Sequence, residues 1–367
     1  MCTRRGRTPG ALAAARHTAH ETRGAAMTQP RQDEDFVRDT GPVQAELLAY
    51  CYRMLGSVHD AEDLVQETLM RAWQGYGAFE GRASMRTWLY RIATNVCLRA
   101  LERRERRDLP IGLGGPDPDP TRALDPELPG HAWLQPIPDA LLGQPPAGPA
   151  DLAGDPAAVA TARESMRLAL TAAFQFLPPR QRAVLILRDV LAWRAAEVAA
   201  LLDTSEAAVN STLQRARARL AEASPVAEQV VRPAEADQRA LLDRYTRAFE
   251  TADIDALMGL LTEDAVWQMP PVPNWFRGRA EIGRLVLRHC PGFRRGWRFV
   301  PLRANGQPAF GVYMADADGV LQAHAIHVLD LVDGPHGPAV AQVVAFHDPD
   351  LFPTFGLPVV PGKVLVP

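Results

Sequence analysis

Apolar residues recur at helical spacing between residues 195 and 220, and this pattern predicts two helices joined by a tight turn. In the second helix they follow one another at steps of four, three and four, as in the buried stripe of an α-helix: Val209, Leu213, Ala216 and Leu220. Thr204 and Ser205 stand where a hydroxyl group caps that helix. The opposite face carries side chains suited to base edges and phosphates, namely Asn210, Ser211, Gln214, Arg215, Arg217 and Arg219. The stretch predicts a DNA-binding helix-turn-helix, and the alternative is an ordinary helical hairpin with a solvated basic face.

Helical periodicity also dominates the rest of the first 223 residues. Residues 31–107 predict a helical bundle, with one apolar stripe over 47–55, a second helix from Asp60 and a third from Arg86. Residues 161–223 predict a four-helix unit that ends in the hairpin. Both segments are therefore expected to be all-α domains.

The spacing of apolar residues changes from a helical to an alternating pattern in the last third of the chain. After three short helices, four strands are expected at 297–303, 309–315, 321–332 and 339–346, separated by Asn-Gly, Asp-Gly and Gly-Pro turn signals. Helices followed by a curled antiparallel sheet predict an α+β cone over residues 236–358.

Charge is distributed unevenly along this chain of net charge −3. Residues 91–107 hold six arginines and two glutamates, and a basic helix with nearby aromatic residues can follow a phosphate backbone and stack unpaired bases. Residues 109–156 hold twelve prolines, seven acids and one arginine, which predicts an extended linker over residues 108–160. Within it, residues 131–142 are too apolar for a plain spacer.

Cysteine spacing and hydropathy exclude several classes of protein. No Cys-x-x-Cys pair supports a metal site or a disulfide framework, and Cys51 and Cys97 are expected to be buried thiols. No run of 18 apolar residues predicts a membrane span. The first 26 residues contain no secretory signal, so residues 1–30 are expected to be a disordered extension, with Met27 as a second possible start, of a cytoplasmic protein.

Two long motifs closely resemble the extracytoplasmic-function (ECF) sigma factors, the small bacterial members of the sigma-70 family. Region 2 of these proteins is similar to DAEDLVQETLMRAW followed by FEGRASMRTWLYRIATNVCL. Region 4 is similar to LPPRQRAVLILRDVLAWRAAEVAALLDTSEAAVNSTLQRARARL. The two motifs occur in the correct order, are correctly linked and cover about half of the chain.

The resemblance implies roles for the residues of region 2. The helix over 60–73 would dock on the β′ clamp helices of RNA polymerase, with contacts from Asp63, Gln66, Glu67 and Arg71. The loop over 79–85 and the helix over 86–107 would capture the melted non-template strand of the −10 element. The candidates for that contact are Arg82, Ser84, Arg91, Asn95, Arg103 and Arg104. Many relatives have aspartate in place of Arg99, so promoter preference is not transferred at that position.

For region 4 the resemblance implies a contact with the β flap and recognition of the −35 element through the major groove. Base-edge contacts are expected from Asn210, Ser211, Gln214 and Arg215, and phosphate contacts from Arg217 and Arg219. The linker of sigma factors threads the RNA exit path, and an acidic linker would mimic nucleic acid there. On that hypothesis, serine at Trp133 and Leu134 would impair initiation without changing promoter recognition.

The third domain resembles the SnoaL-like, ketosteroid-isomerase-like fold, on its element order and on MPPVPNWFRG, RANGQPAF and AHAIHVL. Such cones enclose an apolar pocket suited to a small molecule. The candidates for its lining are Trp267, Met269, Trp275, Phe276, Tyr313, His324 and His327. The two histidines are three residues apart on a strand and are expected to point to opposite faces, which disfavours a metal pair. Nothing in the sequence brings a catalytic carboxylate into the pocket, although Asp264, Asp316, Asp330 and Asp348 are available.

Together these features predict a transcription initiation factor that binds core polymerase, recognises two promoter elements and melts one, with a C-terminal domain that modulates its activity. No cofactor or metal is expected, and no phosphate-binding loop is present. The expected partners are core RNA polymerase, promoter DNA and a small-molecule ligand or an anti-sigma factor. One alternative is a SnoaL-like enzyme fused to a DNA-binding module, and another is a regulator that binds promoters without polymerase.

Overall fold

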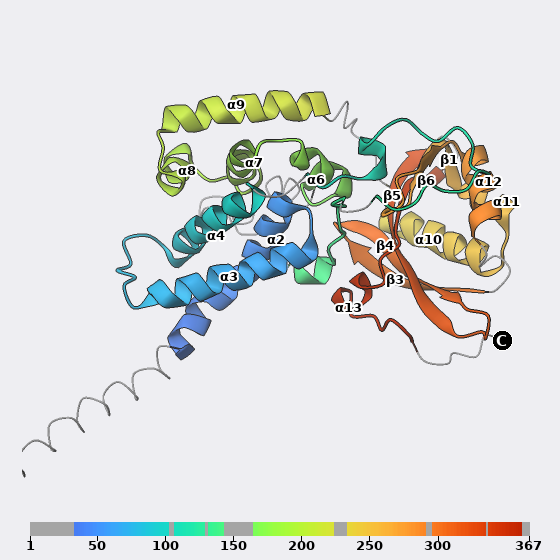
Figure 1. Cartoon of the computed structure of the whole chain (residues 1–367), viewed down its shortest axis with the longest axis horizontal. Helices are drawn as coiled ribbons and strands as arrows, with labels where there is room; N and C mark the ends of the chain where they lie inside the picture. Colours follow the sequence, from blue (N-terminus) through green and yellow to red (C-terminus); the bar gives the residue numbers. More distant parts are fainter. Residues whose placement is uncertain are drawn as a thin grey trace, which may run out of the picture.

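The computed structural model describes residues 33–102, 106–128, 131–142, 164–223, 233–290, 296–334 and 337–361. Figure 1 shows two sets of helices beside an α+β cone. Across these described ranges, no helix is long and apolar enough to cross a membrane. The predicted disordered extension, residues 1–30, lies outside them.

The first helical unit covers residues 41–102. Its elements are the 3₁₀ turn η1 (Gly41–Val43) and the helices α2 (Gln44–Leu55), α3 (Val58–Tyr76) and α4 (Met85–Leu101). Gly56 ends α2 in the left-handed region at φ 70°, and Ser57 then caps α3 by accepting the Asp60 N–H at 3.2 Å. Cys51 and Cys97 are fully buried between α2 and α4, with their sulfurs 3.7 Å apart.

The second helical unit covers residues 164–223 and contains the predicted hairpin. Its elements are α6 (Leu168–Gln175), α7 (Pro179–Leu185), the π-helical turn η5 (Ile186–Val190), α8 (Ala195–Leu202) and α9 (Glu206–Ala223). Asp203 joins α8 to α9 in the left-handed conformation, at φ 51°. A short polar residue tolerates this conformation, so the tight turn forms without glycine.

The cone covers residues 233–361. Its helices are α10 (Glu235–Glu250), α11 (Ile254–Leu260), α12 (Arg279–His289) and α13 (Leu351–Thr354). Its strands are β1 (Leu261–Gln268), β2 (Trp275–Arg277), β3 (Trp297–Ala304), β4 (Gln307–Ala315), β5 (Leu321–Gly334) and β6 (Gly337–Phe346), in the spatial order β2-β1-β6-β5-β4-β3. The four predicted strands, β3 to β6, pair antiparallel as expected, but the whole sheet is mixed because β1 pairs with β6 in parallel. Neither β1 nor β2 was expected, since β2 has three residues and β1 follows a helix directly.

Both faces of this sheet are buried. One face packs on α10–α12 with residues such as Phe310, Val312 and Leu329. The other face, which includes Ile326 and Val328, joins one continuous apolar core with the two helical units. The sheet therefore holds the cone against the rest of the molecule.

The linker is packed against the cone, whereas the sequence predicted an extended chain in which residues 131–142 alone were too apolar for a plain spacer. The 3₁₀ turns η2 (Pro110–Gly112) and η3 (Asp139–Leu141) interrupt it. Asp117 donates its N–H to the Trp275 carbonyl at 2.8 Å, and Trp275 Nε1 donates to the Gly114 carbonyl at 3.0 Å. Farther along, Leu134 and Ile137 are fully buried. The apolar residues noted at 131–142 thus belong to the hydrophobic core, although the rest of the linker contains few apolar residues.

Candidate nucleic-acid interface and ligand cavity

Helix α9 presents a polar face to solvent. Val209, Leu213 and Ala216 are buried against α7 and α8. All six predicted DNA-contact residues on the other side are exposed: Asn210, Ser211, Gln214, Arg215, Arg217 and Arg219. Ser205 Oγ accepts the Ala208 N–H at 3.2 Å, which caps the helix as expected.

The arginines of this face differ in their contacts. Arg217 binds Asp189 of η5 through two hydrogen bonds, of 2.8 and 2.7 Å, and this carboxylate raises the pKa of the guanidinium above its usual value. Arg215 donates to Ser211 on its own helix at 2.6 Å. A phosphate contact from Arg217 therefore requires its ion pair with Asp189 to open or to be shared.

The candidates for the −10 strand lie on α4 and the loop before it. Arg91 and Asn95 are exposed and lie one helical turn apart, on the same face of α4. Ser84 caps that helix by accepting the Thr87 N–H at 3.1 Å, so it has a structural role in addition to any contact with DNA. Arg82 is exposed beside Glu80, with 3.0 Å between Nε and the carboxylate. Arg103 and Arg104 lie outside the described residues.

The candidates for polymerase contact share one exposed part of α3. Asp63 and Gln66 are exposed, and Arg71 forms an ion pair with Glu67, one turn earlier, at 2.5 Å. Met70, with 59% of its surface exposed, lies in the same part of the helix. An exposed methionine among charged side chains is typical of a surface that binds another protein.

The two helical units contact each other through α4. The guanidinium of Arg86 lies 5.1 Å from the centre of the Tyr90 ring and 5.4 Å from that of Trp193 in the second unit. Arg86 also donates to Glu46 at 2.7 Å. The sequence analysis did not predict this contact. The tryptophan between two short helices, in LAWRAAEV, could have indicated it.

Buried Arg182 of α7 forms a second contact between the units. It donates to the carbonyls of Met54, Gln175 and Leu177 and to the Gln175 side chain. Burial lowers its pKa to about 10. A cation held by oxygens of both units orients them relative to each other.

An apolar cavity of about 290 Å³ lies between the helices and the sheet of the cone. Its lining comprises Leu124, Phe249, Trp267, Met269, Val272, Leu285, His289, Cys290, Trp297, His324, His327, Ala345 and His347. Of the seven residues proposed from the sequence, Trp267, Met269, His324 and His327 line this cavity. Leu124 comes from the linker, so part of the wall belongs to a segment outside the cone.

Trp275, Phe276 and Tyr313 do not line the cavity, contrary to expectation. The Trp275 indole is turned toward the linker carbonyl of Gly114, and Phe276 is fully buried in the core between helices and sheet. Tyr313 points to the opposite face of the sheet, where it packs on Phe352 and donates to the Pro358 carbonyl at 2.8 Å. Tyr313 points away from the cavity because of the alternation of side chains along its strand. The positions of Trp275 and Phe276 depend on the three-dimensional shape of the cone, which the sequence did not show.

His324 and His327 both face the cavity, so the expectation that they point to opposite faces is wrong. Val312 pairs with Ala325 and Tyr313 pairs with Ala323, which leaves His324 as an extra residue in a β-bulge of β5. The bulge shifts the alternation by one residue and turns both imidazoles inward. Among the described residues, no group of three or more potential metal ligands is placed to hold a metal ion.

Burial keeps three histidines of the cavity neutral. Desolvation lowers the pKa of His324 to about 4 and that of His347 to about 3, and it lowers the pKa of His327 well below the usual value. Two buried nitrogens of the lining, Trp297 Nε1 and His289 Nε2, have no hydrogen-bond partner within the described part of the chain. The cavity thus combines apolar walls with two unused polar atoms.

Comparisons with known proteins assign a family to each part. The sigma-70 region 2 family matches residues 42–107, the sigma-70 region 4 family matches residues 167–220, and the SnoaL-like domain family matches residues 242–347. The chain is 50% identical over 326 residues to the ECF RNA polymerase sigma factor SigG of Mycobacterium tuberculosis H37Rv, which covers 88% of this chain and 84% of SigG.

A second relative has a solved structure. The chain is 28% identical over 289 residues to the ECF RNA polymerase sigma factor SigJ of the same strain, which covers 76% of this chain and 80% of SigJ. The crystal structure of Mycobacterium tuberculosis SigJ covers 88% of this chain and 99% of the SigJ chain, at 26% identity and a TM-score of 0.54.

Proposed function

This chain belongs to the ECF RNA polymerase sigma factors. We propose that its exposed helix faces each bind a different partner. The protein directs promoter-specific transcription initiation, for which it binds core RNA polymerase and promoter DNA. The observation that supports the division is the separation of the polar residues of α3, α4 and α9, which lie on three different helices of two units. The alternative of a SnoaL-like enzyme fused to a DNA-binding module is not favoured.

In this proposal α9 reads the −35 element. Exposed Asn210 and Gln214 lie one turn apart, as base-edge contacts require, and Ser211 and Arg215 add hydrogen-bonding groups beside them. Arg219 contacts a phosphate, and Arg217 does so after it leaves Asp189. Asp63, Gln66, Glu67 and Arg71 bind polymerase, while Arg82, Ser84, Arg91 and Asn95 hold the melted −10 strand. Arg103 and Arg104, which lie outside the described residues, stay candidates for the same contact.

We further propose that the arrangement in Figure 1 is a resting form. Helix α4 contacts α7 and α8 directly. The −10 and −35 elements are about 25 base pairs apart, roughly 85 Å along B-DNA at about 3.4 Å per step. The units must therefore separate before both elements are bound together.

The cone is proposed to modulate that separation by binding a small molecule. Its cavity suits a neutral, planar, largely apolar compound with a hydrogen-bond acceptor for the unused nitrogens of Trp297 or His289. The described lining contains no carboxylate, which isomerase chemistry would require as a base, so we propose binding without catalysis. Because Leu124 forms part of the wall, an occupant would also act on the linker.

Run-off transcription with purified core polymerase tests this function. The full-length protein is expected to stimulate promoter-directed transcripts, and Asp63→Ala with Gln66→Ala is expected to reduce that stimulation without weakening DNA binding by α9. Transcription that is independent of the protein would overturn the proposal.

Two substitutions in α9 test the assignment of its residues. Gln214→Ala should cost about 1–3 kcal/mol and relax specificity at one position, because a base contact is lost. Arg219→Ala should weaken binding to all sequences alike and reduce the salt dependence by about one counterion. Equal behaviour of the two variants in binding measured across salt concentrations would contradict the assignment.

A further inference from the structure

A second cavity lies where the first helical unit, the linker and the cone meet. Its volume is about 500 Å³. It is lined by Arg107, Glu127, His131, Ala132, Trp133, Leu134, Gln135, Pro270, Pro271, Phe346, His347, Asp348 and Leu351. We call this the junction pocket. It is separate from the cavity inside the cone, although His347 lies in the walls of both.

The junction pocket has an excess of negative charge. Arg107, the one arginine among the described residues of the lining, is already bound, because it donates to the Asp60 carboxylate at 2.5 Å and to the Trp133 carbonyl at 2.9 Å. Glu127 and Asp348 form no ion pair with an arginine within the residues that the structure describes. Among the described residues, neither carboxylate of the lining has an arginine partner, and His59 is the imidazole that acts on Asp348, whereas Arg107 already has an anion.

Burial adds to this imbalance at Asp348. The carboxyl group accepts the Asp350 N–H through Oδ1 at 3.1 Å, while Oδ2 has no hydrogen bond from any residue that the structure describes. Desolvation raises the pKa of this group above its usual value. A positive charge placed beside Asp348 would offset that cost.

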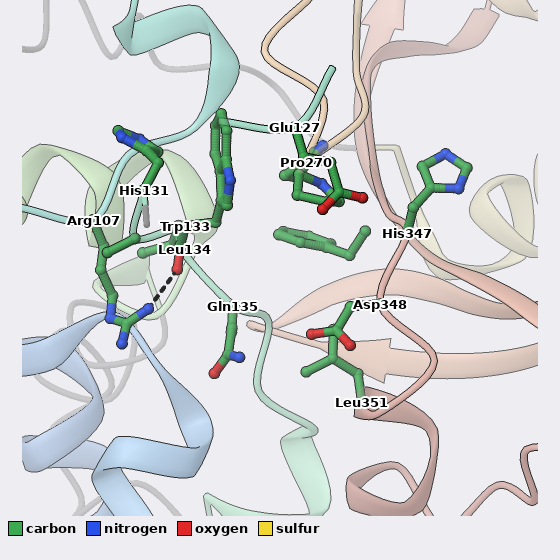
Figure 2. A pocket seen from close by; sticks show the side chains of 13 residues that line it. Arg107, Glu127, His131, Trp133, Leu134, Gln135, Pro270, His347, Asp348 and Leu351 are labelled. Carbon is green, nitrogen blue, oxygen red and sulfur yellow. Dashed lines mark hydrogen bonds between the residues drawn. The ribbon is translucent and has the colours of Figure 1, made fainter. Parts of the chain in front are cut away.

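An aromatic wall faces the carboxylates. Figure 2 shows Trp133 on one side of the hollow and His347 on the other, with the carboxylates of Glu127 and Asp348 between them. The Trp133 ring makes an edge-on contact with His131, at 4.5 Å between ring centres, and the backbone carbonyl of Trp133 is held by Arg107. A ring fixed in this way offers a flat surface for stacking and for cation–π attraction.

We propose that the junction pocket binds an aromatic amine, with the ammonium group between Glu127 and Asp348 and the ring against Trp133. Glu127 and Trp133 belong to the linker and Asp348 follows the last strand of the cone, so the bound amine bridges the two. The ligand thereby fastens the linker to the cone. This site does not depend on any occupant of the cone cavity.

Calorimetric titration of the full-length protein with three probes of similar size tests the proposal. Tyramine carries an ammonium group, 4-ethylphenol has the same ring without charge, and 3-(4-hydroxyphenyl)propionate carries a carboxylate. Tyramine is expected to bind at one site, about tenfold or more tightly than 4-ethylphenol, and the carboxylate is expected not to bind. Equal affinity for the three compounds, or no binding of tyramine at millimolar concentration, would overturn the proposal.

Variants locate the site. Glu127→Gln and Asp348→Asn should each weaken tyramine binding about fivefold, since each removes one negative charge from the lining. Asp318→Asn, which changes an exposed carboxylate in the turn between β4 and β5, serves as the matched control and should leave the affinity unchanged. Glu127 is exposed, so its replacement does not endanger folding. Loss of binding in all three variants, or in none, would refute the site. Because the measurement is of binding alone, its outcome is independent of the transcription assays that test the proposed function.

Discussion

Individual side chains of α9 differ in the intramolecular contacts that they would have to give up to bind DNA. Gln214 is exposed and has no hydrogen bond within the described residues, whereas Arg217 is held by both oxygens of Asp189. A bidentate pair on the surface stabilises a protein only modestly, yet it fixes where the guanidinium points. Asp189 therefore competes with a phosphate for the same arginine.

Asp189→Asn is expected to strengthen binding of the −35 duplex. The substitution removes the competing negative charge and leaves Arg217 free, so affinity should rise about two- to fivefold at low salt and depend more steeply on salt. Binding of polymerase holoenzyme to −35 DNA at several salt concentrations measures this. The double variant Asp189→Asn with Arg217→Ala should lose the gain, and a gain that persists there would show that Arg217 is not responsible.

The neutral histidines of the cone cavity make stability depend on pH. His324 is neutral in the folded protein down to pH about 4, while in the unfolded chain it binds a proton near pH 6.5. Its contribution is complete above pH 6.5 and is lost as the pH falls toward 4, by about 2 kcal/mol at pH 5.

His324→Phe is expected to preserve stability at pH 7 and to make the decline between pH 6.5 and 4 shallower. Phenylalanine keeps a ring of similar size against Trp297 and His347 and cannot be protonated. Urea unfolding of both proteins at pH 7 and pH 5 gives the comparison. Identical declines would mean that His324 does not account for the pH dependence.

At the scale of elements, α4 has two roles. It carries the candidates for the −10 strand, and it also holds the second helical unit through Arg86, Tyr90 and Trp193. Contacts of this kind contribute about 0.5–2 kcal/mol each, which is small enough for DNA and polymerase to overcome. The strength of this contact therefore sets how readily the two units separate.

Arg86→Met is expected to loosen the two units. Methionine keeps the apolar stem but loses the charge over the Tyr90 and Trp193 rings and the bond to Glu46. The radius of gyration from X-ray scattering should increase, and core-dependent transcription should rise. Arg99→Met, at an exposed arginine of the same helix, is the control for scattering and should leave the radius unchanged.

The elements that the sequence predicted well are those whose burial follows one period. Helices α3 and α9 have apolar stripes that match their buried faces, whereas α2 is buried at every residue from Leu47 to Leu55. The bulge at His324 has no glycine or proline to mark it, so the direction of that side chain was not predictable from alternation. The linker was misjudged for a related reason: its few apolar residues, Leu134 and Ile137, are buried by partners far away in the sequence. The assignments of individual residues to DNA or polymerase contact stay predictions, because the exposure of a side chain does not identify what it binds.

At the scale of the whole molecule, one buried residue joins every part. Asn305, in the turn between β3 and β4, accepts the Ile137 N–H of the linker at 3.0 Å. Its Nδ2 donates to Tyr52 Oη of the first unit and to the Met166 carbonyl of the second unit, both at 2.7 Å. Its backbone is in the left-handed region at φ 56°. The side chain therefore connects the cone, the linker and both helical units.

Asn305→Asp is expected to destabilise the whole protein by about 2–4 kcal/mol. The carboxylate keeps the size and the acceptor but cannot donate to Tyr52 or Met166, and it places a charge in a buried site. Urea unfolding should show the midpoint shifting for signals from the helices and from the cone together. Separate shifts would indicate that the parts unfold independently.

The doubly covered sheet of the cone also has an evolutionary consequence. When a gene fusion joins two proteins that fold separately, either partner can be lost by deletion and the other survives unchanged. Here a deletion of the cone would leave Ile137, which is bonded to Asn305, without its cover, and a deletion of the helices would expose Ile326 and Val328. Lineages that discard the cone should therefore carry a polar replacement at the position of Ile137, and the loss of the domain should leave that trace in their linkers.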